Sequence, residues 1–356
     1  MRPSKKTVLP AAFAVSLAVG ALAVPSASLA RSAHPRVSAL ACAAIGNPYR
    51  TKVSVLSGCG YKFFPRQQVH ALPGGGTSYT YIVDGGTLAY NIPPAGFDAL
   101  QATPRQLREY NLPSKAVLGT RRWTAMMRNL HFVTPARTLI QGPSSAAFVI
   151  NSPNWAGVVA SGHSNYNEVV ADYTEPHIGS SVCSPDAEGT WVGLGGVTDA
   201  LGQEGTAYGT GHPHGPWWEV VRADDSNVSG PNYQNWTASA GDHISTVLVY
   251  NGSKYTFTLD DDTSGRVMSP SYTTSVYGGN TAEVITEVPG SFHLSNFGTI
   301  PVSNAKATAG STTKDLASFT YNRYQIWDGS QVMASATAPT NPSGGSKFSI
   351  SQSHCD

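Results

Sequence analysis

The chain contains few charged residues: Asp, Glu, Lys and Arg make up 13% of its 356 residues, which is about half their share in an average globular protein. This scarcity does not indicate disorder, because 40% of the residues are hydrophobic and can build a core. The formal net charge is only +1. A dedicated nucleic-acid-binding protein needs a basic excess, so we expect no nucleic-acid partner.

Long hydrophobic runs are absent after the first thirty residues. Residues 1–30 have a basic start, an apolar run over 8–24 and a small-x-small site at 28–30, which predict a signal peptide. No later stretch approaches the 18 apolar residues of a membrane span. We therefore expect a secreted, extracellular protein that leaves the membrane once its signal peptide is removed. Nothing in the sequence indicates an oligomer, so we expect a monomer.

Charge is unevenly divided along the rest of the chain. Residues 31–149 contain 13 Lys and Arg but three acids, a net charge of +10, whereas residues 150–356 contain seven Lys and Arg and 19 acids, a net charge of −12. These halves are either two unrelated domains or a basic prosegment, residues 31–150, on an acidic body, residues 151–356. In the second interpretation the prosegment is an intramolecular inhibitor, and its attraction to the body fails when acid protonates the carboxylates.

Cysteine is also scarce, with four residues and no CxxC spacing, which argues against a zinc ribbon. Of the three possible pairings we favour Cys42–Cys59 with Cys183–Cys355, because a cross-pairing would obstruct release of the prosegment. His212-Pro213-His214 lacks a third ligand nearby. We therefore expect no metal and no cofactor.

The basic segment has mixed α and β signals. Two β-rich runs, 77–83 and 87–90, flank Asp84-Gly85-Gly86 and predict a hairpin. Thr103 followed by Pro104 predicts the start of a short helix. Residues 132–153 show no clear periodicity and contain Pro and Gly clusters, which predicts a linker where cleavage is tolerated.

From Asn154 onward the pattern is a succession of short strands without a capped amphipathic helix, which predicts an all-β antiparallel sandwich or barrel. The predicted strands are Gly157–Ala160, Glu168–Tyr173, Thr190–Leu194, Trp217–Arg222, His243–Tyr250, Lys254–Leu259, Ala282–Val288 and Ser318–Ile326. Residues 260–265 resemble the start of a calcium loop but have Ser271 at the twelfth position. We interpret them as a solvated turn.

Several catalytic motifs are missing: the chain has no GxSxG elbow, no HExxH, no P-loop and no GxGxxG that opens a helix. Carboxylate and carboxamide chemistry remains. Gln203 follows a Gly-rich turn, and Glu283 and Glu287 share one face of a predicted strand. Taken alone, these residues are weak evidence, because exposed Glu in strands is common.

The order of the motifs is more specific. Along the body stand Asn154-Trp155-Ala156-Gly157, Trp191-Val192-Gly193-Leu194-Gly195-Gly196, Gln203, Pro216-Trp217-Trp218-Glu219, Ala282-Glu283-Val284-Ile285-Thr286-Glu287 and Leu294-Ser295-Asn296-Phe297. Over about 200 residues this series resembles the glutamic peptidases, the eqolisin family of secreted acid endopeptidases. The resemblance implies a concanavalin-like double antiparallel β-sandwich whose concave sheet forms a cleft for protein or peptide substrates, and a prosegment removed on activation.

The resemblance also implies roles for individual residues. The family's catalytic Gln and Glu fall on Gln203 and Glu287, and its cleft-lining tryptophans and acid fall on Trp155, Trp191, Trp217 and Glu219. Strand parity places Trp217 and Glu219 on one face and Trp218 in the packing on the other. Two departures stand out, because family members often carry Asp where this chain has Gly195 and Gly215.

Metal-free amide hydrolysis needs a base, an oxyanion donor and an acid. We expect ionised Glu287 to take a proton from a water held beside Gln203 and to pass it later to the leaving nitrogen. The Gln203 carboxamide N–H would then stabilise the oxyanion. A Glu base with an ordinary pKa of about 4.3 implies an acidic optimum.

Two alternatives remain open at this stage. The first is a non-catalytic sandwich that binds carbohydrate or peptide, suggested by the two missing Asp residues. The second is a glycosidase with Glu283 and Glu287 as its paired acids. Its difficulty is geometric, because acids at positions i and i+4 of one strand lie about 13 Å apart, and glycosidases need roughly 5–9.5 Å.

Overall fold

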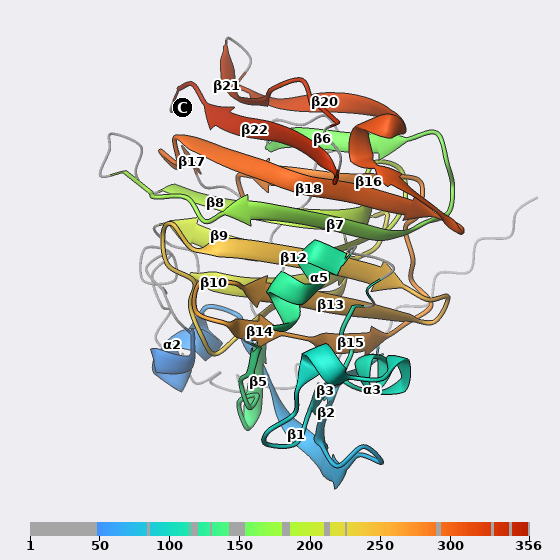
Figure 1. Ribbon diagram of the computed structural model, residues 1–356. Coiled ribbons are helices and arrows are strands. Elements are labelled where there is room, and N and C mark those ends of the chain that lie inside the picture. The colour runs from blue at the N-terminus through green and yellow to red at the C-terminus, as the bar shows by residue number, and fades with distance from the viewer. Residues whose placement is uncertain are drawn as a thin grey trace, which may run out of the picture. The chain divides into compact units, whose positions relative to one another are not determined.

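The structure is a computed structural model whose strands form two layers, here called sheet A and sheet B (Figure 1). It describes residues 48–83, 86–113, 115, 120–128, 130–141, 154–179, 186–209, 214–224, 226–289, 293–328, 331–341 and 344–354. These residues belong to one compact unit, Arg36–Asp356. The predicted signal peptide, residues 1–30, lies outside the described residues.

Sheet A is antiparallel and carries the motif-bearing strands. Its neighbouring strands are, in order, β20 (Thr320–Trp327), β6 (Trp155–Ser161), β16 (Ala282–Glu287), β8 (Asp186–Gly195), β9 (Leu201–Gly209), β10 (Gly215–Val221), β11 (Asn227–Tyr233), β5 (Thr138–Gln141) and β1 (Lys62–Ala71). The short β17 (His293–Leu294) runs parallel to the start of β8.

Sheet B packs against sheet A. Its strands are β21 (Val332–Ala336), β22 (Ser346–Gln352), β18 (Thr299–Ala309), β7 (Tyr166–Thr174), β12 (His243–Tyr250), β13 (Lys254–Asp261), β14 (Arg266–Met268), β15 (Pro270–Thr273), β3 (Gly86–Ile92) and β2 (Thr77–Val83). Two short strands attach to it: β19 (Thr312–Asp315) to β18 and β4 (His131–Phe132) to β14.

The helices are short: η1 (Pro48–Arg50), α2 (Val53–Gly58), η2 (Ala99–Gln101), α3 (Pro104–Glu109), α5 (Thr120–Met127) and η3 (Leu316–Ser318). α3 begins as predicted, because Thr103 and Gln106 form a reciprocal capping box. The predicted hairpin is also present, as strands β2 and β3.

Alternation of residues along the strands creates the core. Val192 and Leu194 of β8 face sheet B, and both are fully buried. Trp218 is fully buried in the same core, where its ring stacks on Phe257 at 4.7 Å, so it packs between the sheets as predicted. The eight strands and the antiparallel sandwich expected from the sequence are confirmed.

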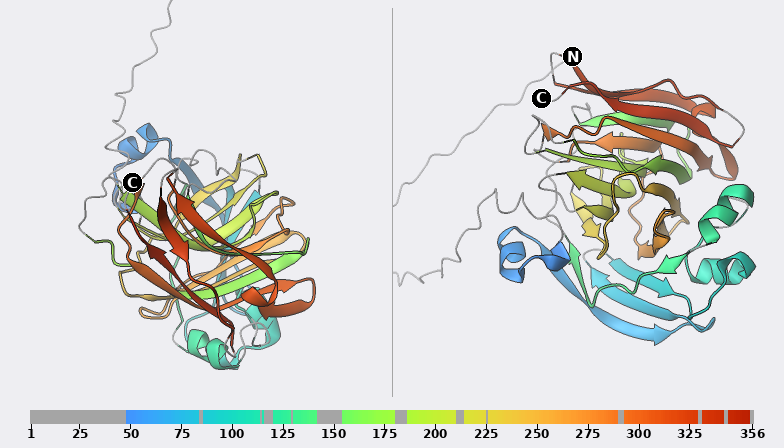
Figure 2. Two further views of the ribbon diagram at one scale, coloured as in Figure 1. Left: turned by 90° about the horizontal axis from the view of Figure 1, so that it is seen from above. Right: turned by 60° about the vertical axis from the view of Figure 1, so that its left-hand side comes forward.

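Two strands join the sheets at their edges. β20 pairs with β6 through residues 320–324 and with β21 through residues 325–327. β1 pairs with β5 through residues 62–65 and with β2 through residues 66–71, with a register shift between Arg66 and Gln68. Figure 2 shows the N-terminal strands curving from one layer to the other. These bridges protect strand edges that would otherwise be free to pair with other chains.

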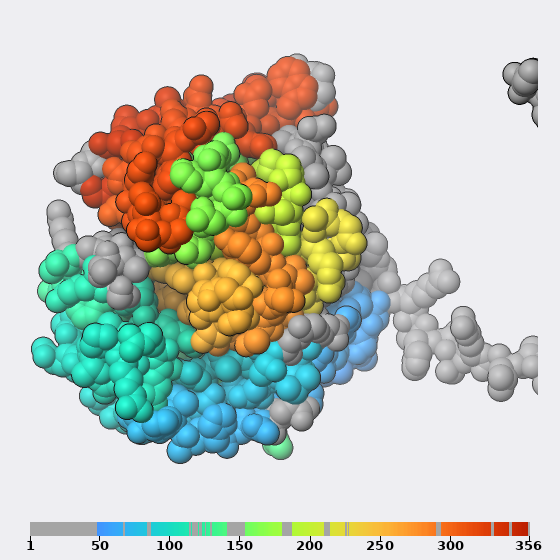
Figure 3. Space-filling view, turned by 90° about the vertical axis from the view of Figure 1, so that its right-hand side faces the viewer, coloured from blue at the N-terminus to red at the C-terminus, as the bar shows by residue number. Residues whose placement is uncertain are grey.

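The described residues 48–141, here called the N-terminal segment, extend both sheets of the body. In sheet A Asn232 is opposite Gln141, and in sheet B β15 pairs with β3. α5 lies over β12 and β13 (Figure 1), where Trp123 and Met126 pack in one cluster with the outward-facing Val170 and Val247. Figure 3 shows this segment lying directly against the body strands that follow residue 250.

These contacts change two expectations. Residues 132–153 are not a linker throughout, because Thr138–Gln141 is a paired strand with Ile140 buried. Residues 142–153 lie outside the described residues, so the domain boundary near 150 stays a prediction. The described contacts between segment and body include strand pairing and apolar packing. Protonation of carboxylates does not weaken such contacts, so acid alone is not expected to release the segment.

The remaining predictions concern cysteines and loops. Cys59 is disulfide-bonded, but Cys42, Cys183 and Cys355 lie outside the described residues, so the pairings stay predictions. Residues 262–265 form a turn, in which Asp261 accepts the N–H groups of Thr263 and Ser264 at 3.0 Å. Asp260 and Asp261 instead end strand β13 and are buried, so the prediction of a solvated turn is wrong for these two residues. Within the described ranges no helix is long and apolar enough to cross a membrane. In these ranges no cluster of three His, Cys, Asp or Glu could hold a metal ion either.

Candidate active site

The predicted site residues lie on one face of sheet A. Alternation places Trp155, Trp191, Gln203, Trp217, Glu219 and Glu287 opposite to the core-facing residues of the same strands. We call this surface the site face. An apolar cluster on it contains Trp155, Trp191, Trp217, Tyr233 and Ile285. Five neighbouring strands, β6, β16, β8, β9 and β10, therefore carry the predicted site together.

Glu287 is held by donors on both of its oxygens. The Trp191 indole nitrogen donates to Oε2 at 2.9 Å, and the Asn154 side-chain amide donates to Oε1 at 2.9 Å. Trp155 also interacts favourably with this carboxyl, and its ring meets that of Trp191 edge-on at 5.1 Å. Glu287 is 4% exposed. N–H groups can only donate, so these donors by themselves favour the carboxylate and oppose the effect of burial.

Gln203 is fully buried and is held by Glu219. Its amide nitrogen donates to Glu219 Oε1 at 2.5 Å, while its own Oε1 has no hydrogen-bond partner among the described residues. Strand register places the two residues directly opposite each other on β9 and β10. One amide hydrogen of Gln203 is thus engaged, and a second hydrogen and the carbonyl oxygen remain for other partners.

Burial raises the pKa of both site acids. The pKa of Glu219 rises to about 7 because the carboxyl is desolvated, and the Gln203 hydrogen bond opposes this rise. The pKa of Glu287 rises well above its ordinary value through burial and through the charge of Glu219, against the effect of its N–H donors. The expectation of an ordinary pKa for Glu287 is therefore wrong for this conformation.

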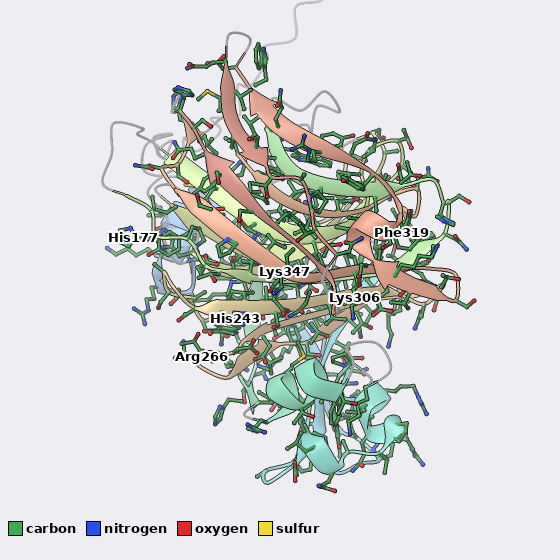
Figure 4. The ribbon with its side chains drawn as sticks, turned by 45° about the horizontal axis from the view of Figure 1, so that its top comes forward. His177, His243, Arg266, Lys306, Phe319 and Lys347 are labelled. Carbon is green, nitrogen blue, oxygen red and sulfur yellow. The ribbon has the colours of Figure 1, made fainter. Side chains whose placement is uncertain are left out.

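Several basic side chains of the body lie on the other sheet. His243, Arg266, Lys306 and Lys347 are carried by strands of sheet B (Figure 4). The pKa of Glu287 is instead shifted first by burial, then by a second carboxyl, and in the opposite direction by N–H donors. Neutral donors therefore provide the stabilisation that a cation provides in an ion pair.

Register relates the two predicted catalytic residues. Gln203 is opposite Gly193, Gly193 is opposite Glu283, and Glu287 lies four residues further along β16. The structure thus links Gln203 to Glu287 through Glu219, which bonds the first and acts electrostatically on the second. Glu283, in the same row as Gln203, is fully buried, and burial raises its pKa well above the ordinary value.

Because Gly193 has no side chain, Trp191 and Glu283 can pack closely around it. A Cβ added there would lie 2.7 Å from the Trp191 ring and 2.8 Å from Glu283 Oε1, closer than real Cβ contacts allow. Any side chain at this position would push Trp191 away from its bond to Glu287. The Gly of the Trp-Val-Gly motif is therefore explained by the packing of the site face.

Backbone conformation explains why this chain has Gly195 and Gly215 at the two positions where family members often have Asp. Gly195 has φ +93°, and a Cβ there would lie 1.9 Å from the Ala200 carbonyl oxygen. Gly215 has φ +114°, and a Cβ there would lie 2.7 Å from the Trp236 carbonyl oxygen. Neither turn accepts an Asp. Asp199 instead supplies a carboxylate to the first turn and accepts the N–H groups of Gly279 at 2.9 Å and Asn280 at 3.1 Å.

Sequence reasoning missed three side chains at the site. Asn154 was part of a recognised motif but received no role, although its amide holds Glu287. Tyr233 belongs to the site-face cluster, and Tyr61 of the N-terminal segment packs against that cluster. The position of Asn154 in a motif was a signal that it could belong to the site. Neither tyrosine had one, because only strand pairing brings β11 and residues 61–65 to the site.

An antiparallel β-sandwich with a buried carboxyl and carboxamide on one sheet face defines the class of the protein as a glutamic-peptidase-like hydrolase. The sequence pattern of the Peptidase A4 family matches residues 153–348, more than half of the chain. The chain belongs to this family, the eqolisins, and is a glutamic peptidase, an endopeptidase hydrolase.

Solved structures with a similar chain include scytalido-glutamic peptidase with a peptide-based transition state analog, at 19% identity and TM-score 0.45. The same enzyme with a transition state analog inhibitor has 19% identity and TM-score 0.46. SCP-B, a member of the eqolisin family in complex with the tripeptide Ala-Ile-His, has 20% identity and TM-score 0.44. Each comparison covers 56% of this chain and 98% of the other. No curated protein matches the chain.

Proposed function

We propose that this glutamic peptidase is a secreted acid endopeptidase that hydrolyses protein substrates with Glu287 and Gln203. The observation that carries the proposal is the set of N–H donors around Glu287, one on each oxygen, on the sheet face that also carries Gln203. Trp155, Trp191, Trp217 and Glu219 share this face and are proposed to contact substrate. Family membership favours this function over the glycan-binding and glycosidase alternatives.

The charge of Glu219 affects the ionisation of Glu287 in acid. With a pKa of about 7, Glu219 is mostly neutral in acid and no longer opposes ionisation of Glu287. The N–H donors then favour the charge on Glu287. Neutral Glu219 removes one of the two causes that raise the pKa of Glu287, whereas burial continues to raise it. When the pair holds one negative charge, we propose that Glu287 carries it and acts as the base.

The chemical steps follow from this charge distribution. The Glu287 carboxylate takes a proton from water, and the water oxygen attacks the peptide carbonyl carbon. The carbonyl electron pair moves to the oxygen, which accepts the second amide hydrogen of Gln203. Glu287 then gives its proton to the peptide nitrogen as the carbon–nitrogen bond breaks. A carboxylic acid and an amine leave, and Glu287 is again ionised.

The basic region, residues 31–150, is proposed to be a prosegment that inhibits the body, residues 151–356. Its described part continues both sheets and packs on sheet B, which supports an intramolecular partner rather than an unrelated domain. Because strand pairing persists in acid, activation is proposed to need cleavage within residues 142–153. Secretion rests on the signal-peptide pattern of residues 1–30.

The test is to acidify the purified precursor and to follow its N-terminal sequence and its digestion of casein. We expect a new N-terminus within residues 142–153 and digestion of casein at acid pH. Glu287→Gln should keep the melting temperature and lose digestion, whereas the exposed-acid control Asp224→Asn should retain both. Casein digestion by a folded Glu287→Gln protein would refute the assignment.

A further inference from the structure

Tyr61 is the residue by which the N-terminal segment reaches the site. Its ring packs against the site-face cluster that contains Trp155, Trp191, Trp217 and Tyr233. The same ring packs against a second cluster formed by Leu56 and Ile140. It thus connects the segment's own small core to the proposed substrate-binding surface.

The backbone around Tyr61 is fixed on both sides. α2 ends in a Schellman motif, in which Gly60 at φ +83° donates to the Ser57 carbonyl at 3.2 Å and Tyr61 donates to the Leu56 carbonyl at 3.0 Å. The shared cluster with Leu56 supplies the apolar contact typical of this motif. On the other side, Lys62 begins β1 opposite Gln141. The fixed backbone on both sides of Tyr61 therefore limits the positions that its ring can take.

The ring lies toward the Gln203 end of the site. Burial raises the pKa of Tyr61 to about 12, and the charges of Tyr61 and Glu219 both act on the Tyr233 hydroxyl. Tyr233 is opposite Trp217 in register, and Glu219 accepts from Gln203. Tyr233 thus interacts electrostatically with Tyr61 of the segment and with Glu219, whose carboxyl accepts from the proposed catalytic amide of Gln203.

Tyr49 reinforces this arrangement. Its hydroxyl donates to the Tyr233 carbonyl at 3.3 Å and accepts the Ile140 N–H at 3.3 Å. The segment therefore contacts β11 through its own strand β5 and through two tyrosines. Removal of the segment would expose both the Tyr233 backbone and the space that the Tyr61 ring fills.

We propose that the space filled by Tyr61, beside Tyr233 and Trp217, is a subsite for an aromatic side chain of the substrate. Tyr61 occupies it in the precursor as a substrate side chain would. Aromatic rings and the carboxyl of Glu219 match the apolar body and polar tip of a tyrosine. The inference rests on the proposed function and adds the kind of residue the enzyme selects and the residue that blocks it.

The test uses the full-length precursor and two quenched fluorescent peptides that differ at one position, Tyr in one and Ala in the other. Initial rates are measured in acid before gel analysis detects processing. Tyr61→Ala should cleave the Tyr peptide at least about 10-fold faster than the unaltered precursor, in keeping with the 10–200-fold range of apolar pocket contacts. Tyr61→Phe should remain as inhibited as the unaltered precursor, because it retains the ring.

Two further variants keep the test decisive. Tyr61→Leu preserves an apolar contact with Leu56 but lacks the ring, so it should also release activity if Tyr61→Ala fails to fold. Tyr79→Ala is the matched control, because this tyrosine of the same segment packs beneath Arg66 at 4.7 Å from its ring centre and outside the site-face cluster. Its precursor should stay as inhibited as the unaltered one.

The processed enzyme supplies the second readout. It should prefer the Tyr peptide over the Ala peptide in kcat/KM, and Tyr233→Ala should reduce this preference mainly through KM. If processed enzyme is active but Tyr61→Ala and Tyr61→Leu stay inhibited, or no preference exists, the subsite is refuted and the proposed function stands. If processed enzyme shows no acid proteolysis, the proposed function itself fails.

Discussion

Buried acids lie both on the site face of sheet A and in the core between the two sheets, and they have different hydrogen-bond partners. On the site face, Glu287 receives N–H groups from an indole and an amide. Between the sheets, Glu175 accepts the Thr206 hydroxyl at 2.5 Å and Glu188 accepts the Thr190 hydroxyl at 3.1 Å. Burial is the largest cause of the raised pKa in each of these acids.

The difference between the donors explains the difference in role. An N–H group can only donate, so it stabilises a carboxylate and leaves no acceptor for a protonated acid. A hydroxyl group can reverse its hydrogen bond, so it serves a neutral carboxyl equally well. Burial raises the pKa of the acids in both places, and at Glu287 two N–H donors oppose this rise. The following experiments test this contrast.

The largest expected effect comes from Gln203→Ala. The substitution removes the proposed oxyanion donor, and loss of one such donor typically costs 100-fold to 1,000-fold in kcat, roughly 3–4 kcal/mol. Steady-state kinetics of the processed enzyme should show this loss at a temperature where the variant is still folded, because deletion of a buried, hydrogen-bonded side chain also lowers stability. The exposed residue Gln325 gives the control variant Gln325→Ala, which should be fully active. A Gln203→Ala enzyme within about 3-fold of the parent would exclude the role.

Trp191→Phe should have a smaller effect of about 10-fold on kcat at low pH. It removes one N–H donor from Glu287, and the loss of a donor to the charged form raises the pKa of that carboxyl further. The acid limb of the kcat profile should therefore move to higher pH. Trp218→Phe is the matched control, since Trp218 packs in the core against Phe257 and should lower stability without moving the limb. An unmoved limb in Trp191→Phe would separate Trp191 from the ionisation of Glu287.

The sequence predicted the sandwich well because its strands bury one face in the core. Alternation in Thr190–Leu194 or His243–Tyr250 is visible directly, and the structure confirms those strands. β9 was not predicted, because Gly202 and Glu204 face the core where apolar residues are usual. The Tyr255 ring packs against Gly202, because a Cβ added there would lie 2.4 Å from the ring. Glu204 is fully buried.

The site was predicted in part for a similar reason. Motifs identified the residues of the site face, and parity assigned them to it, but neither predicted the hydrogen bond between Gln203 and Glu219. That contact depends on the register of β9 against β10. The N-terminal segment reaches the site because its strand β5 pairs with β11, where Gln141 is opposite Asn232. Pairing between distant segments leaves no periodic signal in either one.

The smallest effect concerns the acids between the sheets. Burial raises the pKa of Glu175 to about 8 from an ordinary value of 4.5. In the unfolded chain Glu175 ionises near the ordinary value, so the folded state binds the extra proton between these two pH values. Its contribution to stability is therefore fully present below pH 4.5 and is lost as pH rises toward 8. The free energy of unfolding should decrease across this window.

Glu175→Gln tests this contribution directly. The amide cannot ionise and can still bond to the Thr206 hydroxyl. Urea unfolding at pH 4 and pH 8 should show a smaller decrease in stability for the variant than for the parent, while activity in acid stays within about 2-fold. The exposed control Asp224→Asn should follow the parent at both pH values. Equal pH dependence in parent and Glu175→Gln would mean that Glu175 holds no extra proton in the fold, and the contrast between the site face and the core between the sheets would be lost.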